Sequence, residues 1–194
     1  MVAEGDVTAG LRAVLERTRD ELAALSWFSS VGQPPTEAET AEAQAYLMGI
    51  DASAIEAGST GDIHWVADWA EAERVVRDPA GADWWAAEAE LHEATLAKLG
   101  PVAASPGFTS ALNETVHAVS DIVMGAAALA AARAGLAEQA VIRVAAGAAG
   151  ETAEQVLALR LAGLAPDHPF EIKRRLYAGG RWPLGVVGRA LAVF

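Results

Sequence analysis

The sequence contains no cysteine among its 194 residues. This absence excludes disulfide-stabilised scaffolds, thiolate zinc sites, iron–sulfur clusters and cysteine nucleophiles. Long hydrophobic runs are also lacking, because the longest uncharged run in the helical centre, Ile122–Ala132, is bounded by Asp121 and Arg133. A run of that length is too short to cross a bilayer. The first residues do not resemble a signal peptide, so we expect a cytoplasmic protein that does not bind membranes.

Motifs that would identify a catalytic family are missing. The sequence has no GxGxxG that follows a strand, and no GxxxxGK[ST], GxSxG or HExxH. No motif identifies a protein family, and the sequence alone does not decide whether the protein is an enzyme.

Basic residues are scarce in the first half. Residues 1–100 carry 19 acidic and 6 basic side chains, and residues 101–194 carry 7 and 8, within a formal net charge of −12. An acidic half repels nucleic acid, so we expect no nucleic-acid partner. The one basic cluster, Lys173–Arg175 with Arg181, is interpreted as the C-terminal turn of a helix, where it would complement the helix dipole.

Apolar residues are abundant, at 53% of the chain, which is enough for a sizeable core. Their spacing is helical nearly throughout. We therefore predict an all-α fold, a single domain over residues 1–194 with about six or seven helices. Acidic, tryptophan-rich helices should occupy residues 1–100, and Ala/Gly-rich core helices and an apolar tail should occupy residues 101–194. The expected helices cover residues 7–25, 36–48, 62–77, 82–99, 109–134, 137–164 and 169–178.

Two capping-box patterns support these boundaries. Thr36 with Glu39 predicts the start of the second helix, and Ser53 with Glu56 predicts a single turn. Small residues in 124–136 and 144–153 predict that these two helices approach closely in the centre of the bundle. The apolar tail is expected to dock on the core or on another chain, although its own structure, over residues 180–194, is not predicted.

One candidate ligand pocket lies in the helix over residues 82–99. Trp84, Trp85 and the leucines define its apolar sector, and Glu88 and His92 fall inside that sector. A buried carboxylate is costly unless it is paired. Glu88 and His92 could simply hydrogen-bond each other across one turn, or they could line a functional pocket beside the two indoles. Trp84 and Trp85 are about 100° apart around the helix, so they cannot face the same way.

Two polar trios are interpreted as solvated helix faces. Glu114, His117 and Asp121 oppose the apolar stripe of their helix, and His64, Asp68 and Glu71 lie off the stripe formed by Trp65 and Trp69. The face of Glu114 continues into Met124, Gly125, Ala128 and Ala132. This continuation suggests a helix that is buried all round in its second half.

Two functions remain open, and the first is a non-catalytic module that binds a small ligand or a protein partner. It would be a homodimer formed through the tail and the alanine-rich helices. The second is a metal-dependent or acid/base enzyme. Its site, between antiparallel helices, would hold zinc, manganese or iron. The ligands would be Glu88, His92, Glu114, His117 and Asp121. A third idea, an immunity or antitoxin-like partner, rests only on acidity and small size.

Overall fold

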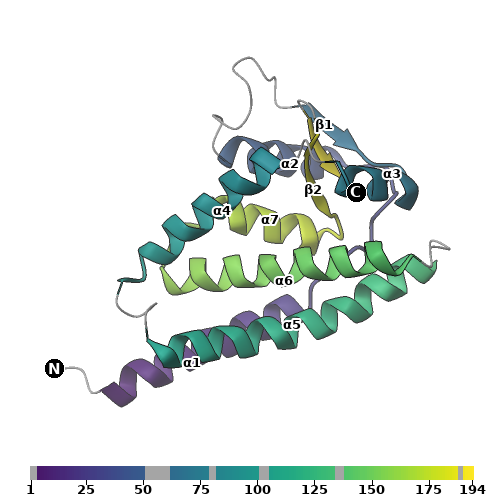
Figure 1. Cartoon of the computed structure of the whole chain (residues 1–194). Coiled ribbons are helices and arrows are strands. Elements are labelled where there is room, and N and C mark those ends of the chain that lie inside the picture. Colours follow the sequence, from purple (N-terminus) through teal and green to yellow (C-terminus); the bar gives the residue numbers. More distant parts are fainter. Residues whose placement is uncertain (1–3, 51–61, 79–81, 101–104, 134–137, 188–189) are drawn as a thin grey trace.

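The computed structural model describes residues 4–50, 62–78, 82–100, 105–133, 138–187 and 190–194. These ranges contain seven helices and three short strands, and most of the described residues are helical (Figure 1). The predicted all-α, single-domain class is confirmed in that the fold is mostly helical, and the structure adds a small three-stranded sheet that was not predicted. The elements in chain order are α1 (Glu4–Ala23), α2 (Glu37–Gly49), β1 (Asp62–Trp65), α3 (Trp69–Val76), α4 (Ala82–Ala97), α5 (Pro106–Arg133), α6 (Gln139–Leu161), α7 (Pro169–Ala178), β2 (Pro183–Val187) and β3 (Ala190–Val193).

Local signals fixed most helix boundaries. At the start of α2, the Thr36 hydroxyl accepts a hydrogen bond from Glu39 N at 3.2 Å, and Glu39 Oε2 accepts one from Thr36 N at 2.7 Å. This is the predicted capping box. Pro169 occupies the first turn of α7, as predicted. The Ser53–Glu56 pattern and the predicted stop at Gly135 lie outside the described residues.

Helices α5 and α6 lie side by side along one side of the molecule (Figure 1). Their contact is close because small residues line it: a Cβ on Gly150 would lie 2.6 Å from Ser120 Oγ. Val119 and Val123 of α5 and Ala145 and Ala149 of α6 are fully buried. The predicted close approach of the two small-residue helices is confirmed, but α5 lies at the surface and not in the centre of the bundle.

The three strands form one small sheet in the order β1-β3-β2. Strand β1 pairs in parallel with β3, Asp62 opposite Ala190 and Trp65 opposite Val193, and β2 pairs antiparallel with β3. The prediction of a helix from residue 62 was therefore wrong in its first part. Val66 N donates to Val193 O at 2.8 Å, so the backbone of this segment is satisfied by a distant strand instead of by its own turns. The helix begins only at Trp69, after Asp68 caps it.

The apolar tail docks on the core of its own chain. Trp182 and Phe194 exchange two backbone hydrogen bonds, at 2.6 and 2.8 Å, and Leu191–Phe194 are all buried. The Phe194 ring packs edge-on against Trp69, with centroids 4.8 Å apart. The prediction of a docked tail is confirmed, and these residues are buried in the protomer.

In the part of the chain that the structure describes, we find no helix with both the length and the apolar character needed to cross a bilayer.

Candidate functional site

Glu88 of α4 is fully buried, as its position on the apolar sector predicted. The buried side of α4 also carries Trp84 and Thr95, four residues before it and seven after. Helix α4 packs on α6, and α6 packs on α7 (Figure 1). Hydrogen bonds to Gln155 of α6 and Lys173 of α7 place Glu88 where these helices meet.

The carboxylate of Glu88 is the centre of a buried polar cluster, which we call the Glu88 cluster. Lys173 Nζ of α7, Tyr46 Oη of α2 and Gln155 Nε2 of α6 all donate to Glu88 Oε1, the last two over 2.7 and 3.3 Å. Lys173 Nζ also donates to Gln155 Oε1 at 3.1 Å. Lys173 is 1% exposed and Glu88 is 0% exposed. A buried ion pair is tolerated when further hydrogen bonds satisfy both partners, and Oε1 meets this condition.

Two expectations about these residues were wrong. Glu88 makes its ion pair with Lys173 and not a hydrogen bond with His92. Lys173 lies in the middle of α7 and faces inward, so only Arg175 of the basic cluster belongs to the last turn of that helix. A buried lysine is costly unless a carboxylate neutralises it. Glu88, 85 residues earlier in the chain, provides that carboxylate.

The second oxygen of Glu88 has a different environment. Glu88 Oε2 is buried and has no hydrogen-bond partner among the described residues, and the same is true of Tyr177 Oη. The Thr152 hydroxyl donates to Ala148 O at 2.8 Å. Burial raises the pKa of Tyr177 and of Tyr46 far above the usual tyrosine range, and the charge of Glu88 adds to both shifts. Both phenols therefore remain protonated, and each can donate one hydrogen bond.

His92 lies at the edge of the Glu88 cluster. Its side chain is 15% exposed, and its Nε2 is 3.9 Å from Glu154 Oε1. Burial lowers the pKa of His92, which keeps the imidazole neutral at pH 7. The neighbouring Glu151 lies at the exposed rim, with Oε1 3.3 Å from Gln155 Nε2, and desolvation raises its pKa.

The two tryptophans of α4 face different ways, as their spacing required. Trp84 is buried and packs edge-on against Tyr46, with centroids 5.5 Å apart, so it forms a wall of the Glu88 cluster. Trp85 is 38% exposed and lies over Gly185 of β2. Of the four residues predicted to line a pocket, the structure brings together Trp84, Glu88 and His92. It places Trp85 against strand β2.

The alternative metal ligands are not brought together. Glu114, His117 and Asp121 are exposed on α5, which confirms that they form a solvated face. Helix α6 packs against both α4 and α5 and lies between them in Figure 1. Among the described residues, no three His, Asp or Glu side chains are grouped so that they could hold a metal ion.

The second half of α5 differs from the expectation. It was predicted to be buried all round, but Met124, Gly125, Ala128 and Ala132 are exposed. These residues continue the face that carries exposed Glu114, His117 and Asp121 in the first half, and the contacts of α5 with α6 are made by its opposite side, through Val119 and Val123. The apolar face is therefore left uncovered in this chain.

The second polar trio lies on β1 and α3. Asp68 caps α3 by accepting from Glu71 N at 2.8 Å, and Glu71 Oε1 is 2.9 Å from His64 Nε2. His64 and Asp68 are exposed, which agrees with the predicted solvated face. These contacts fasten the strand to the helix and need no ligand.

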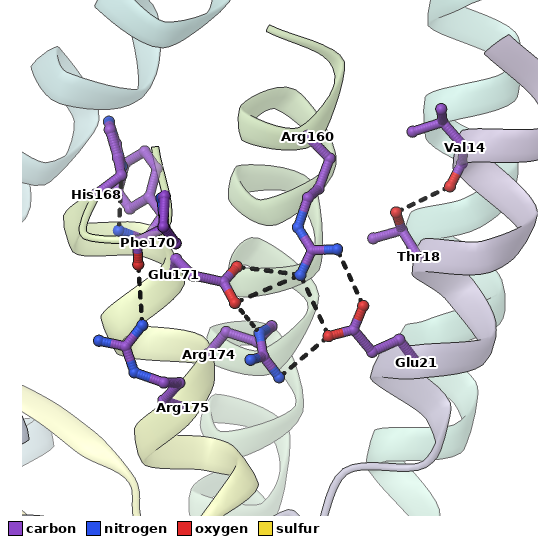
Figure 2. Close-up of polar contacts among 10 residues, drawn as sticks. Val14, Thr18, Glu21, Arg160, His168, Phe170, Glu171, Arg174 and Arg175 are labelled. Atoms are coloured by element: carbon purple, nitrogen blue, oxygen red, sulfur yellow. Dashed lines mark hydrogen bonds and ion pairs between the residues drawn. The ribbon is translucent and has the colours of Figure 1, made fainter. Parts of the chain in front are cut away.

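A second ion-pair network joins α1, α6 and α7 (Figure 2). Arg160 donates to both Glu21 and Glu171, over 3.0 to 3.4 Å, and Arg174 bridges the same two carboxylates, at 2.7 and 3.2 Å. Each charged side chain in this network contacts one of opposite charge. The network therefore holds the three helices together and indicates no ligand site.

Among the described basic side chains, Arg181 makes the largest number of hydrogen bonds. Its guanidinium donates to both oxygens of Glu39, at 2.8 and 3.1 Å, and to the carbonyls of Ser30, Gln33 and Pro34. The guanidinium also lies 5.3 Å from the centre of the Trp65 ring. Arg181 is buried against residues 30–34 and takes no part in a basic surface.

Sequence reasoning missed Lys173, Gln155, Tyr46 and Tyr177. One signal was available for Lys173: the pattern Phe170, Lys173, Tyr177 repeats at i, i+3 and i+7 and marks the buried side of α7. Gln155 similarly shares its side of α6 with Thr152 and Leu159.

Comparisons of this chain with protein-family models, with curated proteins and with solved structures found no match.

Proposed function

We propose that this protein is a non-catalytic binding module and that the Glu88 cluster receives a small protonated amine. One observation carries the proposal: Glu88 Oε2 and Tyr177 Oη are buried and lack a partner within the described residues. Buried polar atoms are nearly always hydrogen-bonded, and an ammonium N–H is a donor from which Glu88 Oε2 could accept.

The charges around the cluster favour a cation. Lys173 and Glu88 neutralise each other, and the rim adds the carboxylates of Glu151 and Glu154. His92 is neutral at pH 7 because burial lowers its pKa, so it does not repel an ammonium group. An ammonium N–H would be donated to Glu88 Oε2, a charge-assisted hydrogen bond.

The aromatic walls favour the same ligand class. Tyr46 and Trp84 meet edge-on, and the rings of His92 and Phe170 lie 6.0 Å apart. Aromatic faces attract ammonium groups more than neutral polar groups of the same size. The same rings would also provide apolar contacts for a short alkyl chain on the amine.

The test is calorimetry with methylammonium, propylammonium and the neutral analogue propanol. We expect binding of an amine, no binding of propanol, and about tenfold weaker binding by Tyr177→Phe, which loses an oxygen that can accept from the ligand. Met48→Ala, an exposed change on α2, is the matched control and should bind as the parent does. No heat with any amine would leave the cluster as a core feature that holds ordered water, and the proposal would fail.

A second candidate, an acid/base enzyme, has one observation in its favour. The pKa of Glu151 is raised and that of His92 is lowered beside the same buried ion pair, and shifted values of this kind are frequent at catalytic sites. The two groups would then exchange protons with a substrate at the rim. A metal-dependent version gains no support from the geometry, and elemental analysis of the parent beside Glu88→Ala/His92→Ala tests it directly.

The expected partner is a second copy of this chain. The buried tail no longer supplies that contact, which leaves the alanine-rich helices. Absence of nucleic-acid binding is also proposed, and it is supported by the internal pairing of Lys173, Arg174, Arg175 and Arg181 with carboxylates. A cytoplasmic location stays a prediction from the sequence.

A further inference from the structure

A row of polar side chains leads from the Glu88 cluster to the surface along one side of α6. Gln155 is fully buried, whereas Glu151, one turn earlier on the same side of the helix, is exposed. The Gln155 amide nitrogen donates to Glu88 Oε1 and to Glu151 Oε1, and both distances are 3.3 Å. One nitrogen thus links a carboxylate in the core to a carboxylate at the rim, and the two oxygens lie no farther apart than twice that distance.

The carboxylate of Glu151 lacks a cation. In the part of the chain that the structure describes, it forms no ion pair, and its hydrogen bond is with the neutral amide of Gln155. Lys173, the buried cation of the cluster, is hydrogen-bonded to Glu88 and Gln155. The positive charge of Lys173 is therefore already matched by Glu88.

The charges of the cluster and its rim do not balance. Among the described residues there, three are carboxylates, those of Glu88, Glu151 and Glu154, and one is a cation, Lys173. His92, which lies 3.9 Å from Glu154, is neutral at pH 7 because burial lowers its pKa. A ligand with one positive charge leaves one carboxylate in excess, whereas a ligand with two positive charges matches the excess.

The phenol of Tyr177 lies within reach of both carboxylates. The charges of Glu88 and of Glu151 both raise its pKa, and they do the same to the pKa of Tyr46. Tyr177 Oη and Glu88 Oε2 are buried atoms that have no hydrogen-bond partner among the described residues, and both side chains are 0% exposed. The unpartnered atoms and the carboxylate without a cation therefore belong to one site.

We propose that the ligand of the Glu88 cluster is a short linear diamine with a chain of three or four carbon atoms. This inference rests on the amine site proposed above and names its ligand class. The inner ammonium group donates to Glu88 Oε2 and Tyr177 Oη, and the outer one donates to Glu151. Both ammonium groups then form charge-assisted hydrogen bonds.

The chain length follows from the spacing of the two carboxylates. In a staggered chain, the nitrogen atoms of 1,3-diaminopropane and 1,4-diaminobutane lie roughly 5 to 6 Å apart. That separation is of the same order as the largest distance allowed between the bridged oxygens of Glu88 and Glu151. The methylene groups would lie beside the rings of Tyr46 and Tyr177, which supply the apolar contacts.

The experiment is calorimetry on the full chain at pH 7 with 1,3-diaminopropane and 3-amino-1-propanol. The two ligands have the same length, but the second carries a hydroxyl in place of the outer ammonium group. We expect the parent to bind the diamine at least about tenfold more tightly, because only the diamine pairs with Glu151. Glu151→Gln should weaken diamine binding about tenfold and aminopropanol binding by less than about threefold.

Glu90→Gln is the matched control. Glu90 is an exposed carboxylate on α4, two residues after Glu88, and its replacement removes the same charge. Diamine binding by this variant should stay within about twofold of the parent, since an exposed charge away from the site is screened by salt. Equal losses in Glu90→Gln and Glu151→Gln would mean general attraction to an acidic protein and would overturn the proposal. Circular dichroism checks that both variants keep their helices.

The remaining outcomes separate this inference from the proposed amine site. If the parent binds neither ligand, both proposals fail. If the parent binds both ligands equally, the amine site stands and the diamine is wrong. A preference for the diamine that persists in Glu151→Gln also overturns the inference, because the outer ammonium group then lies elsewhere.

Discussion

Lys173 of α7 donates a hydrogen bond to Glu88 of α4, and neither side chain is in contact with solvent. The pair joins helices that are 85 residues apart in the sequence. Three donors converge on one carboxylate oxygen, which makes Glu88 the polar centre of an otherwise apolar contact.

The first prediction concerns this pair. Lys173→Met should destabilise the protein by about 3–5 kcal/mol, since it leaves a buried carboxylate without its cation. Glu88→Leu/Lys173→Met removes both charges and should cost less than the sum of the single changes. Urea denaturation of the parent, Glu88→Leu, Lys173→Met and the double variant measures the coupling. Additive losses would mean that the two charges do not interact.

The second prediction is a pH dependence. Hydrogen bonds from Arg181 lower the pKa of Glu39 from its ordinary value of 4.5 to about 2. A carboxyl group whose pKa is depressed in the folded state stabilises that state above pH 4.5, and the contribution is lost as the pH falls toward 2. Glu39→Gln should therefore cost most at pH 6 and progressively less between pH 4.5 and 2. A cost that is the same at every pH would contradict the assignment.

The third prediction compares two glycines with positive φ. A Cβ on Gly180, at φ +80°, would lie 2.3 Å from Ser29 Oγ and 2.7 Å from Ser30 N, whereas a Cβ on Gly163, at φ +63°, meets nothing within 4 Å. Gly163→Ala should cost only the backbone strain, about 1–2 kcal/mol. Gly180→Ala must also displace the backbone at Ser30 and should cost at least twice as much. Thermal unfolding of both variants provides the comparison, and equal losses would contradict it.

The fourth prediction concerns the docked tail. Phe194→Ala should cost about 3–5 kcal/mol, because the ring is 1% exposed and packs on Trp69. Met48→Ala should change stability by less than about 0.5 kcal/mol, since Met48 is 66% exposed. Similar losses for the two variants in urea would mean that the tail is not part of the core.

The helices were predictable because their signals are local. The Thr36 capping box, the first-turn Pro169 and the periodic leucines all act within one or two turns, so the sequence near each helix is sufficient. The inward position of Glu88 was predictable for the same reason, from the wheel of its own helix.

The strand β1 was not predictable in this way. Its partner, β3, is far along the chain, and the register that pairs Ile63 with Leu191 leaves no trace in the local pattern. Trp65 and Trp69 fit a helical stripe by spacing alone, yet they belong to different elements. Asp68 did carry a local signal, since it caps α3 through Glu71, three residues later.

The partners of Glu88 were hidden by the same limitation. Helical periodicity shows that a carboxylate points inward, but it does not show which helix lies opposite. His92 was the only candidate within one turn, and Lys173 was read as a helix end because two arginines follow it. The exposure of Met124 was likewise decided by which face of α5 the other helices cover, which is a tertiary fact.

The position of β3 has a consequence for how the chain folds. This strand lies between β1 and β2, so the sheet lacks its central strand until residues 190–193 have paired with both neighbours. Arg181 similarly fastens a loop and a helix start that precede it by up to 151 residues. Contacts this distant in sequence slow folding, because a large loop must close before they form. During synthesis, α1 to α6 therefore leave the ribosome before the segment that closes the core, and the contact of Trp69 with Phe194 can form only after that segment is made.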